Sequence, residues 1–123
     1  MPRVVQKRLY GSVTVFWLDR EAAVQSVRKA AEAWAATDPS VVSIVLFGSL
    51  ATGRATATSD ADILVILNDT DVPPLDRPVA FAYRFGDVGL PAELFVYTEE
   101  EVRTNSSSIA EKALRDGVEL VPR

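Results

Sequence analysis

The sequence predicts a protein of mixed α and β structure (α/β, or α+β), because stretches with the pattern of strands alternate with stretches of helical periodicity. Two short runs, 41–47 and 63–67, are almost entirely apolar, which is typical of buried strands. Residues 20–36 instead carry apolar side chains at helical spacing. The chain has 123 residues, 48% of them hydrophobic, so we expect one domain with a substantial core.

The N-terminal region has the composition of β structure. Residues 9–18 are rich in β-branched and aromatic side chains, and Val13, Val15 and Trp17 lie on one face of an alternating pattern. This pattern predicts a strand over residues 9–18. A shorter strand is expected before it, at residues 3–8.

A helix is predicted from about residue 20 to residue 36, with Asp19 as its N-cap. Asp38 and Pro39 follow, and we expect the helix to stop there because a residue before proline disfavours helical geometry. One apolar stripe should face the core, formed by Val24, Val27, Ala31 and Trp34. Trp34 is therefore interpreted as a core residue and not as a platform on which a base stacks.

The two apolar strands are separated by a short polar segment. Gly48 and Ser49 end the first strand, and the second strand begins at Asp60 and Asp62. A parallel pair needs a crossover of about a dozen or more residues, usually helical, and the polar residues 48–59 carry no apolar stripe. We therefore expect antiparallel neighbours, which places the glycine–serine pair and the two aspartates at one edge of the sheet.

The next part of the chain is less clearly patterned. Residues 68–77 are rich in Asn, Asp and Pro and are expected to form a loop. Residues 78–88 alternate like a strand, but we predict a helix because this segment connects two buried strands and must cover the sheet. A further strand is predicted at residues 92–97.

Two short helices and a strand are expected at the C-terminal end. Thr98 and Glu101 have the spacing of a capping box, which predicts the start of the first helix. The second helix is predicted over residues 107–115 and ends at Gly117, since glycine is favoured just after a helix. Residues 118–121 have the composition of a terminal strand.

Three acidic residues are candidates for a metal site. Asp60 and Asp62 are two positions apart at the start of a strand, so their side chains should share a face with Cα atoms about 6–7 Å apart. Two carboxylates at this spacing repel each other unless a cation lies between them, although a simple polar turn has the same pattern. Glu93 is a charged residue in an otherwise apolar strand. It is either a third member of the site or a solvent-facing edge residue.

Gly48 and Ser49 are candidates for phosphate binding. Glycine lets the backbone approach a phosphate closely, and the following amide and the Ser49 hydroxyl can donate hydrogen bonds to it. Gly48 and Gly53 also have the spacing of a P-loop. However, Arg54 and Ala55 stand where that motif needs Lys and then Ser or Thr, so we reject the P-loop interpretation.

The composition limits the chemistry. The chain contains no cysteine and no histidine, which excludes disulfides, thiolate zinc sites, a cysteine nucleophile and a histidine base. Carboxylate and hydroxyl oxygens favour Mg²⁺ or Mn²⁺ over Zn²⁺. The net charge of −4 argues against tight binding of duplex nucleic acid. The N-terminal residues lack the continuous apolar stretch of a signal peptide, and no segment approaches the roughly 18 apolar residues of a membrane span, so we expect a cytoplasmic protein.

The run LFGSLATGRATATSDADILVIL resembles the signature of the DNA polymerase β-like nucleotidyltransferase superfamily: Gly-Ser, ten residues, then Asp-x-Asp within hydrophobic strands. The resemblance covers about residues 20–104, and the chain is similar in size to the minimal nucleotidyltransferases of prokaryotes. It implies the polymerase β-like fold, a small mixed sheet backed by helices. We expect a single domain over residues 1–123, with a strand extension at 1–18, a catalytic core at 19–104 and a C-terminal helix and strand at 105–123.

The resemblance also implies a reaction and a role for each site residue. A nucleoside monophosphate, expected to be AMP from ATP, is transferred to an acceptor hydroxyl with release of pyrophosphate. Asp60 and Asp62 would hold two Mg²⁺ (or Mn²⁺) ions, and Glu93 would complete one metal site and orient or deprotonate the acceptor. The triphosphate would be bound by Gly48, Ser49 and Ser59.

Three departures from the family pattern and two functional classes remain open. Leu50 stands where relatives often have a basic or polar residue, and Glu93 replaces the more usual aspartate. The strand region at residues 3–18 extends beyond a minimal core and is either an edge for strand pairing or an interface. Minimal relatives often act beside a small helical partner protein to which they add AMP, in pairs resembling toxin and antitoxin. The alternative is a non-catalytic, antitoxin-like module that only docks on such a partner. The intact Gly-Ser pair and the three acidic residues favour the enzyme.

Overall fold

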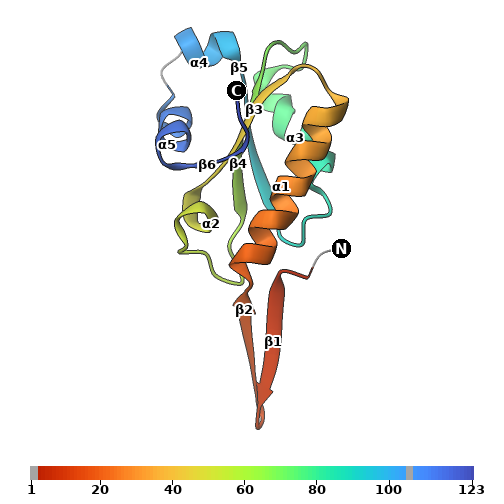
Figure 1. Ribbon diagram of the computed structural model, residues 1–123, viewed down its shortest axis with the longest axis vertical. Coiled ribbons are helices and arrows are strands. Elements are labelled where there is room, and N and C mark those ends of the chain that lie inside the picture. The colour runs from red at the N-terminus through yellow and green to blue at the C-terminus, as the bar shows by residue number, and fades with distance from the viewer. Residues whose placement is uncertain (1–2, 105–106) are drawn as a thin grey trace.

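The computed structural model describes residues 3–104 and 107–123, which form a four-stranded sheet with helices on both faces and a separate β-hairpin (Figure 1). Residues 1, 2, 105 and 106, which the predicted domain ranges include, lie outside the described residues. No helix in the described part of the chain is long and apolar enough to cross a bilayer.

The sheet is mixed and has the order β5-β4-β3-β6. The central strands β3 (Val41–Phe47) and β4 (Ala61–Leu67) are antiparallel neighbours, which confirms the pairing predicted from the short polar segment between them. Strand β6 (Val118–Val121) pairs antiparallel with β3, and β5 (Ala92–Thr98) pairs parallel with β4. The mixed sheet expected from the family resemblance is therefore present.

Two helices cover the two faces of this sheet, and for this reason β3 and β4 are apolar at nearly every position (Figure 1). Helix α1 (Arg20–Thr37) packs on the face that carries Ile44, Leu46, Ile63 and Val65. Helix α5 (Ser108–Asp116) packs on the other face, against Val45, Phe47, Leu64 and Ile66. The alternation of side chains along a strand divides each apolar run between these two cores.

Helix α1 begins and ends where the sequence predicts. The Asp19 carboxylate accepts a hydrogen bond from the Ala22 amide at 3.1 Å, and the helix ends at Thr37, just before Asp38 and Pro39. Trp34 on its inner face is only 1% exposed, which confirms that it is a core residue.

The prediction of a single strand over residues 9–18 is wrong. Two strands, β1 (Val5–Tyr10) and β2 (Val13–Leu18), form an antiparallel hairpin around the two-residue turn Gly11-Ser12. Gly11 has a φ of +62°, a conformation that glycine adopts at no steric cost, and a glycine followed by a small residue is a common hairpin turn. This local signal decides against a continuous strand.

The segment that alternates like a strand is helical, as predicted, but in two short pieces. Helix α3 (Arg77–Phe81) continues into the 3₁₀ helix η2 (Ala82–Phe85), after the 3₁₀ turn η1 (Pro74–Asp76). Phe81 and Phe85 pack against the Trp34 ring, with centroids 5.3 and 6.1 Å away. The expectation of a loop over residues 68–77 thus holds only up to Pro73.

The C-terminal elements agree with the predicted pattern, but glycine stands at position 117 for a different reason from the one expected. Helix α4 (Glu99–Thr104) follows the predicted capping box, and α5 ends at Gly117. Gly117 has a φ of −81° and is not in the left-handed conformation that glycine usually provides after a helix. A side chain there would overlap Val45 and the Ala113 carbonyl, so close packing is what requires glycine at this position.

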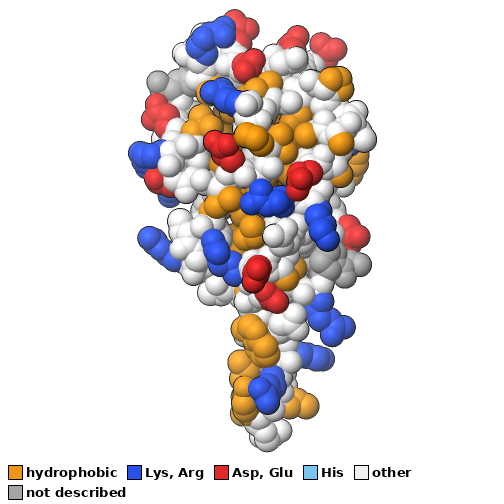
Figure 2. Space-filling model, viewed as in Figure 1, with side chains coloured by type: hydrophobic (Ala, Val, Ile, Leu, Met, Phe, Trp, Pro, Cys, Tyr) orange, Lys and Arg blue, Asp and Glu red, His pale blue; other side chains and the backbone are white. Residues whose placement is uncertain are grey.

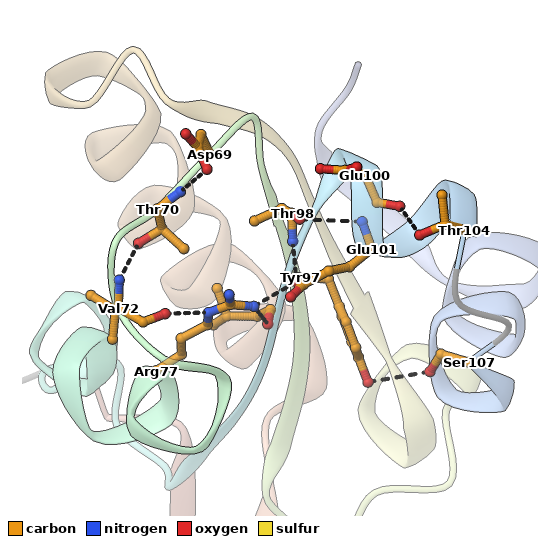
Figure 3. Close-up of polar contacts among 11 residues, drawn as sticks. Asp69, Thr70, Val72, Arg77, Tyr97, Thr98, Glu100, Glu101, Thr104 and Ser107 are labelled. Atoms are coloured by element: carbon orange, nitrogen blue, oxygen red, sulfur yellow. Dashed lines mark hydrogen bonds and ion pairs between the residues drawn. The ribbon is translucent and has the colours of Figure 1, made fainter.

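A buried ion pair ties α3 to α4 (Figure 3). The Arg77 guanidinium is 6% exposed and donates to the Glu101 carboxylate at 2.6 Å and to the Val72 and Val96 carbonyls. The same carboxylate accepts from the Thr98 amide at 2.8 Å, while the Glu101 amide donates to the Thr98 hydroxyl. Arg77 therefore stabilises the Thr98–Glu101 capping box and also the loop around Val72 that precedes α3.

We expect Arg77→Met to lower the free energy of unfolding by about 2–3 kcal/mol at neutral pH, since Glu101 is left partly buried without its partner. The hydrogen bond from Arg77 is the main cause that lowers the pKa of Glu101. A lowered carboxyl pKa stabilises the fold above its unfolded-state value of about 4.3, and this stabilisation is lost as the pH falls through the folded-state pKa. Urea denaturation should therefore show a larger difference from wild type at pH 7 than at pH 3. An equal loss at both pH values would contradict this assignment.

Candidate functional site

Strand register brings the predicted site residues to one end of the sheet. Asp62 pairs with Phe47 across β3 and β4 and with Glu93 across β4 and β5. Gly48 follows Phe47 directly and begins the short helix α2 (Gly48–Thr52). Directly paired residues point to the same face of a sheet, so the Asp62 and Glu93 side chains both lie on the face that α5 covers.

Gly48 lies against the Asp62 carboxylate. Its φ is +76°, a conformation that other residues rarely adopt, and a Cβ built on it would overlap the carboxylate oxygen Oδ2. Two independent features thus require glycine here. One is the backbone conformation, and the other is the direct contact between the Gly-Ser turn and the first residues of β4.

The carboxylates form an electrostatically crowded group. The pKa of Asp62 is raised, first by burial and then by the neighbouring charges of Glu93 and Asp60, and Asp62 and Glu93 are close enough to share a hydrogen bond. The Lys112 ammonium acts in the opposite direction and lowers this pKa. Like charges held this close are a cost to the fold that a bound cation removes.

The donor set fits a hard divalent cation, because all of its ligands are carboxylate oxygens. Asp62 and Glu93 are in contact, and Asp60 lies exposed just before β4. Among the described residues, no three acidic side chains are already drawn together as a closed metal site. The arrangement is therefore an open group of ligands at the sheet edge, with Asp60 the outermost.

A pocket of about 360 Å³ adjoins the carboxylates. It lies between α2 and α5 and combines a backbone turn that can donate hydrogen bonds with two cationic side chains. The residues that line it are Phe47, Gly48, Ser49, Thr52, Arg54, Lys112 and Asp116. Backbone amides, hydroxyls, an ammonium and a guanidinium are groups that bind phosphate oxygens, so the composition of the pocket fits a polyphosphate chain.

Sequence reasoning missed Lys112 as a site residue. It lies on α5, far along the chain from Gly48 and Asp62, and only the packing of α5 on the sheet brings it to the pocket. Nothing in its local sequence indicates this position. Leu50, which departs from the expected family pattern, is fully buried in the core. The cationic side chains that line the pocket are Arg54 and Lys112.

Ser59 is placed differently from the other predicted nucleotide-binding residues. Its hydroxyl accepts a hydrogen bond from the Thr56 amide at 2.8 Å and stabilises the loop before β4. It does not line the pocket beside Gly48 and Ser49. Its role in nucleotide binding remains a prediction.

The comparison with known families agrees with this site. The model of the nucleotidyltransferase domain family matches residues 27–116, so the chain belongs to that family, and it is a nucleotidyltransferase. This confirms the resemblance seen in the sequence. The fold is also similar to that of a candidate nucleotidyltransferase from Sulfolobus solfataricus, with a TM-score of 0.56, 22% identity, and coverage of 84% of this chain and 86% of that one.

A crystal structure of a toxin–antitoxin with AMP-PNP is also similar, with a TM-score of 0.47 and 18% identity, covering 86% of this chain and 75% of that one. Among curated proteins, none matches the chain significantly.

We expect Lys112→Gln to raise the KM for the nucleoside triphosphate by about tenfold or more, because a hydrogen bond to a charged group contributes about 1.5–3 kcal/mol. The measurement is the KM from initial rates. Lys29→Gln is the matched control, since it removes the same charge from an exposed position on α1. A variant with an unchanged KM would show that Lys112 does not contact the triphosphate.

Proposed function

We propose that this nucleotidyltransferase acts in the cytoplasm and transfers AMP from ATP to a hydroxyl group of a small helical partner protein. The observation that carries the proposal is the juxtaposition of the cationic pocket at Gly48 and Ser49 with the Asp62–Glu93 carboxylates. A triphosphate bound in the pocket would have one end beside the carboxylates, where an acceptor can approach from solvent.

The proposed step is a single displacement at the α-phosphorus. The acceptor oxygen forms a bond to this phosphorus while the bond from the phosphorus to the bridging oxygen of the β-phosphate breaks, and pyrophosphate leaves. Glu93 is exposed at the edge strand β5 and accepts the acceptor proton. Arg54 and Lys112 stabilise the negative charge that develops on the leaving pyrophosphate.

Enzymes of this family generally use divalent metal ions. Asp60, Asp62 and Glu93 would hold Mg²⁺ or Mn²⁺, which when bound neutralises the triphosphate charge. Burial and then the neighbouring charges of Glu93 and Asp60 raise the pKa of Asp62. This supports the assignment, because a bound cation would offset the unfavourable negative charge.

Surface properties support a protein acceptor. The net charge of −4 disfavours a nucleic acid. Leu75, Val79 and Tyr83 are 94%, 83% and 68% exposed on η1, α3 and η2. Large apolar side chains that are exposed to this degree are suited to contact with another protein.

The direct test incubates the protein with labelled nucleoside triphosphates, Mg²⁺ and a candidate partner. The candidate is the protein encoded by the adjacent gene. We expect label from the α-phosphate of ATP to appear covalently on the partner, together with pyrophosphate. Tight partner binding without transfer, with every nucleotide and metal tried, would support the docking module instead.

We expect Glu93→Gln to lower kcat by about a hundredfold or more, the usual scale for a positioned acid or base. Glutamine keeps the shape of the side chain but cannot accept the proton. ATP affinity should change by less than about tenfold, because the other two carboxylates and the pocket remain. The measurement is single-turnover transfer together with ATP titration on the same preparation. A variant with wild-type kcat would exclude Glu93 from the reaction.

A further inference from the structure

The β1–β2 hairpin projects from the body of the protein (Figure 1), and apolar side chains are exposed along it (Figure 2). Only its base is anchored, through the buried Val4 and through Val5 and Leu18, which pack against the core. The exposed apolar residues are Leu9, Tyr10, Val13, Val15, Phe16 and Trp17, with between 40% and 71% of each exposed. An isolated two-stranded hairpin is at best marginally stable in water, so this one is expected to have a partner.

The free edge of β2 is open for further pairing. At the base of the hairpin, the Asp19 amide donates to the Val4 carbonyl at 2.6 Å, which defines a hydrogen-bonded pair. Bonded and non-bonded pairs alternate in an antiparallel ladder, so Thr14 and Phe16 belong to non-bonded pairs. Their amide and carbonyl groups therefore point away from β1, and among the described residues no third strand pairs with them.

The two edges of the hairpin differ in charge. Strand β1 carries Lys7 and Arg8, whereas β2 has no charged residue and no proline. Charged residues and proline are the usual means by which proteins keep an edge strand from pairing. The hairpin thus protects its β1 edge and leaves its β2 edge unprotected.

We propose that β2 pairs antiparallel with β2 of a second copy of this chain, forming a four-stranded sheet about a two-fold axis. About a two-fold axis, the same strand from two copies runs antiparallel and each copy presents the same edge to the other. Strand β2 can therefore pair with β2 of the second copy without any other partner strand. Centring the axis on Val15 pairs Val13 with the partner's Trp17 and Thr14 with the partner's Phe16. Aromatic and β-branched residues opposite each other are among the favourable cross-strand pairs.

Charge and the exposed side chains of β2 are compatible with this second copy. The basic β1 strands become the outer strands, three strand spacings or about 14 Å apart, which exceeds the Debye length of about 8 Å at physiological ionic strength. Strand β2 carries Val13, Val15, Phe16 and Trp17, with between 40% and 59% of each exposed, and these side chains meet their counterparts across the shared edge. In addition to these side-chain contacts, the outward amide and carbonyl groups of Thr14 and Phe16 form hydrogen bonds with the second copy in this pairing.

Oligomeric state and amide hydrogen exchange test this pairing in the full chain without any substitution. We expect light scattering to give twice the chain mass of 13.4 kDa, and slow exchange at the Thr14 and Phe16 amides. The outward amides of Lys7 and Leu9 on β1 should exchange fast. A monomer at about 100 µM, with fast exchange at all four amides, overturns the proposal. If the Thr14 and Phe16 amides are protected only when the adjacent-gene product is present, that protein and not a second copy of this chain pairs with β2, and the proposal is overturned.

A matched pair of proline variants tests the edge. Phe16→Pro removes an outward amide of β2 and leaves the β1–β2 ladder intact, and we expect the dimer Kd to rise at least about tenfold. Leu9→Pro removes an outward amide and an exposed apolar residue from β1 in the same way, and it should dimerise like wild type. Equal weakening by both variants overturns the assignment to β2.

If Phe16→Pro disrupts the hairpin itself, a second variant still tests the pairing between the two β2 strands. Val15→Lys keeps every amide but places two lysines opposite each other at the axis, and it should also give a monomer. A dimer that survives this substitution overturns the pairing. None of these residues belongs to the catalytic site, so the result is independent of whether transfer to a partner is found.

Discussion

Asp62→Asn should lower the rate of nucleotidyl transfer by about a thousandfold or more, because a metal ligand supplies several kcal/mol of stabilisation to the transition state. The substitution keeps the shape of the side chain and its contact with Gly48. It removes a charge that burial, Glu93 and Asp60 make unfavourable in the free protein. The variant should therefore be at least as stable as wild type while being nearly inactive.

The measurement is single-turnover transfer of label together with thermal unfolding. Mg²⁺ and ATP should raise the melting temperature of wild type, since a ligand that binds only the native state stabilises it. The double variant Asp60→Asn with Asp62→Asn should abolish this shift. Asp69→Asn, in the exposed loop after β4, is the control and should behave like wild type. An undiminished shift in the double variant would refute the assignment of these two aspartates as metal ligands.

Trp34→Ala should destabilise the protein by about 3–5 kcal/mol through lost burial and the cavity it leaves. The side chain is 1% exposed, stacks on Phe81 and donates from its indole nitrogen to Asp38 at 3.0 Å. Since typical domains are stable by only about 5–15 kcal/mol, the variant should be close to unfolding at physiological temperature.

Urea denaturation of the variant measures this loss. Trp34→Phe is the matched control, because it keeps an aromatic ring at this position and removes the hydrogen bond to Asp38 together with a smaller buried volume than alanine would. It should lose a smaller part of the stability. An alanine variant with normal stability but weaker nucleotide binding would mean that Trp34 belongs to the site and not to the core.

Local sequence patterns were sufficient for most elements of the fold. The helical spacing of Trp34 and the cap at Asp19 predicted α1, and the Thr98–Glu101 pattern predicted the start of α4. These features depend on residues within a few positions of one another. The hairpin was mispredicted because strand-like residues lie on both sides of Gly11 and Ser12, and the turn signal between them is only two residues long.

The sequence by itself determined the antiparallel pairing of β3 and β4, and with it the meeting of Gly48 with the aspartates. The reason is physical, since the twelve residues 48–59 carry no apolar stripe and are poorly suited to the helical crossover that a parallel pair needs. Only the tertiary structure decided the parallel pairing of β5, which sets Glu93 beside Asp62, and the packing of α5, which brings Lys112 to the pocket. These contacts join residues about 30 to 60 positions apart, and they depend on which faces are buried together, which no short stretch of sequence encodes.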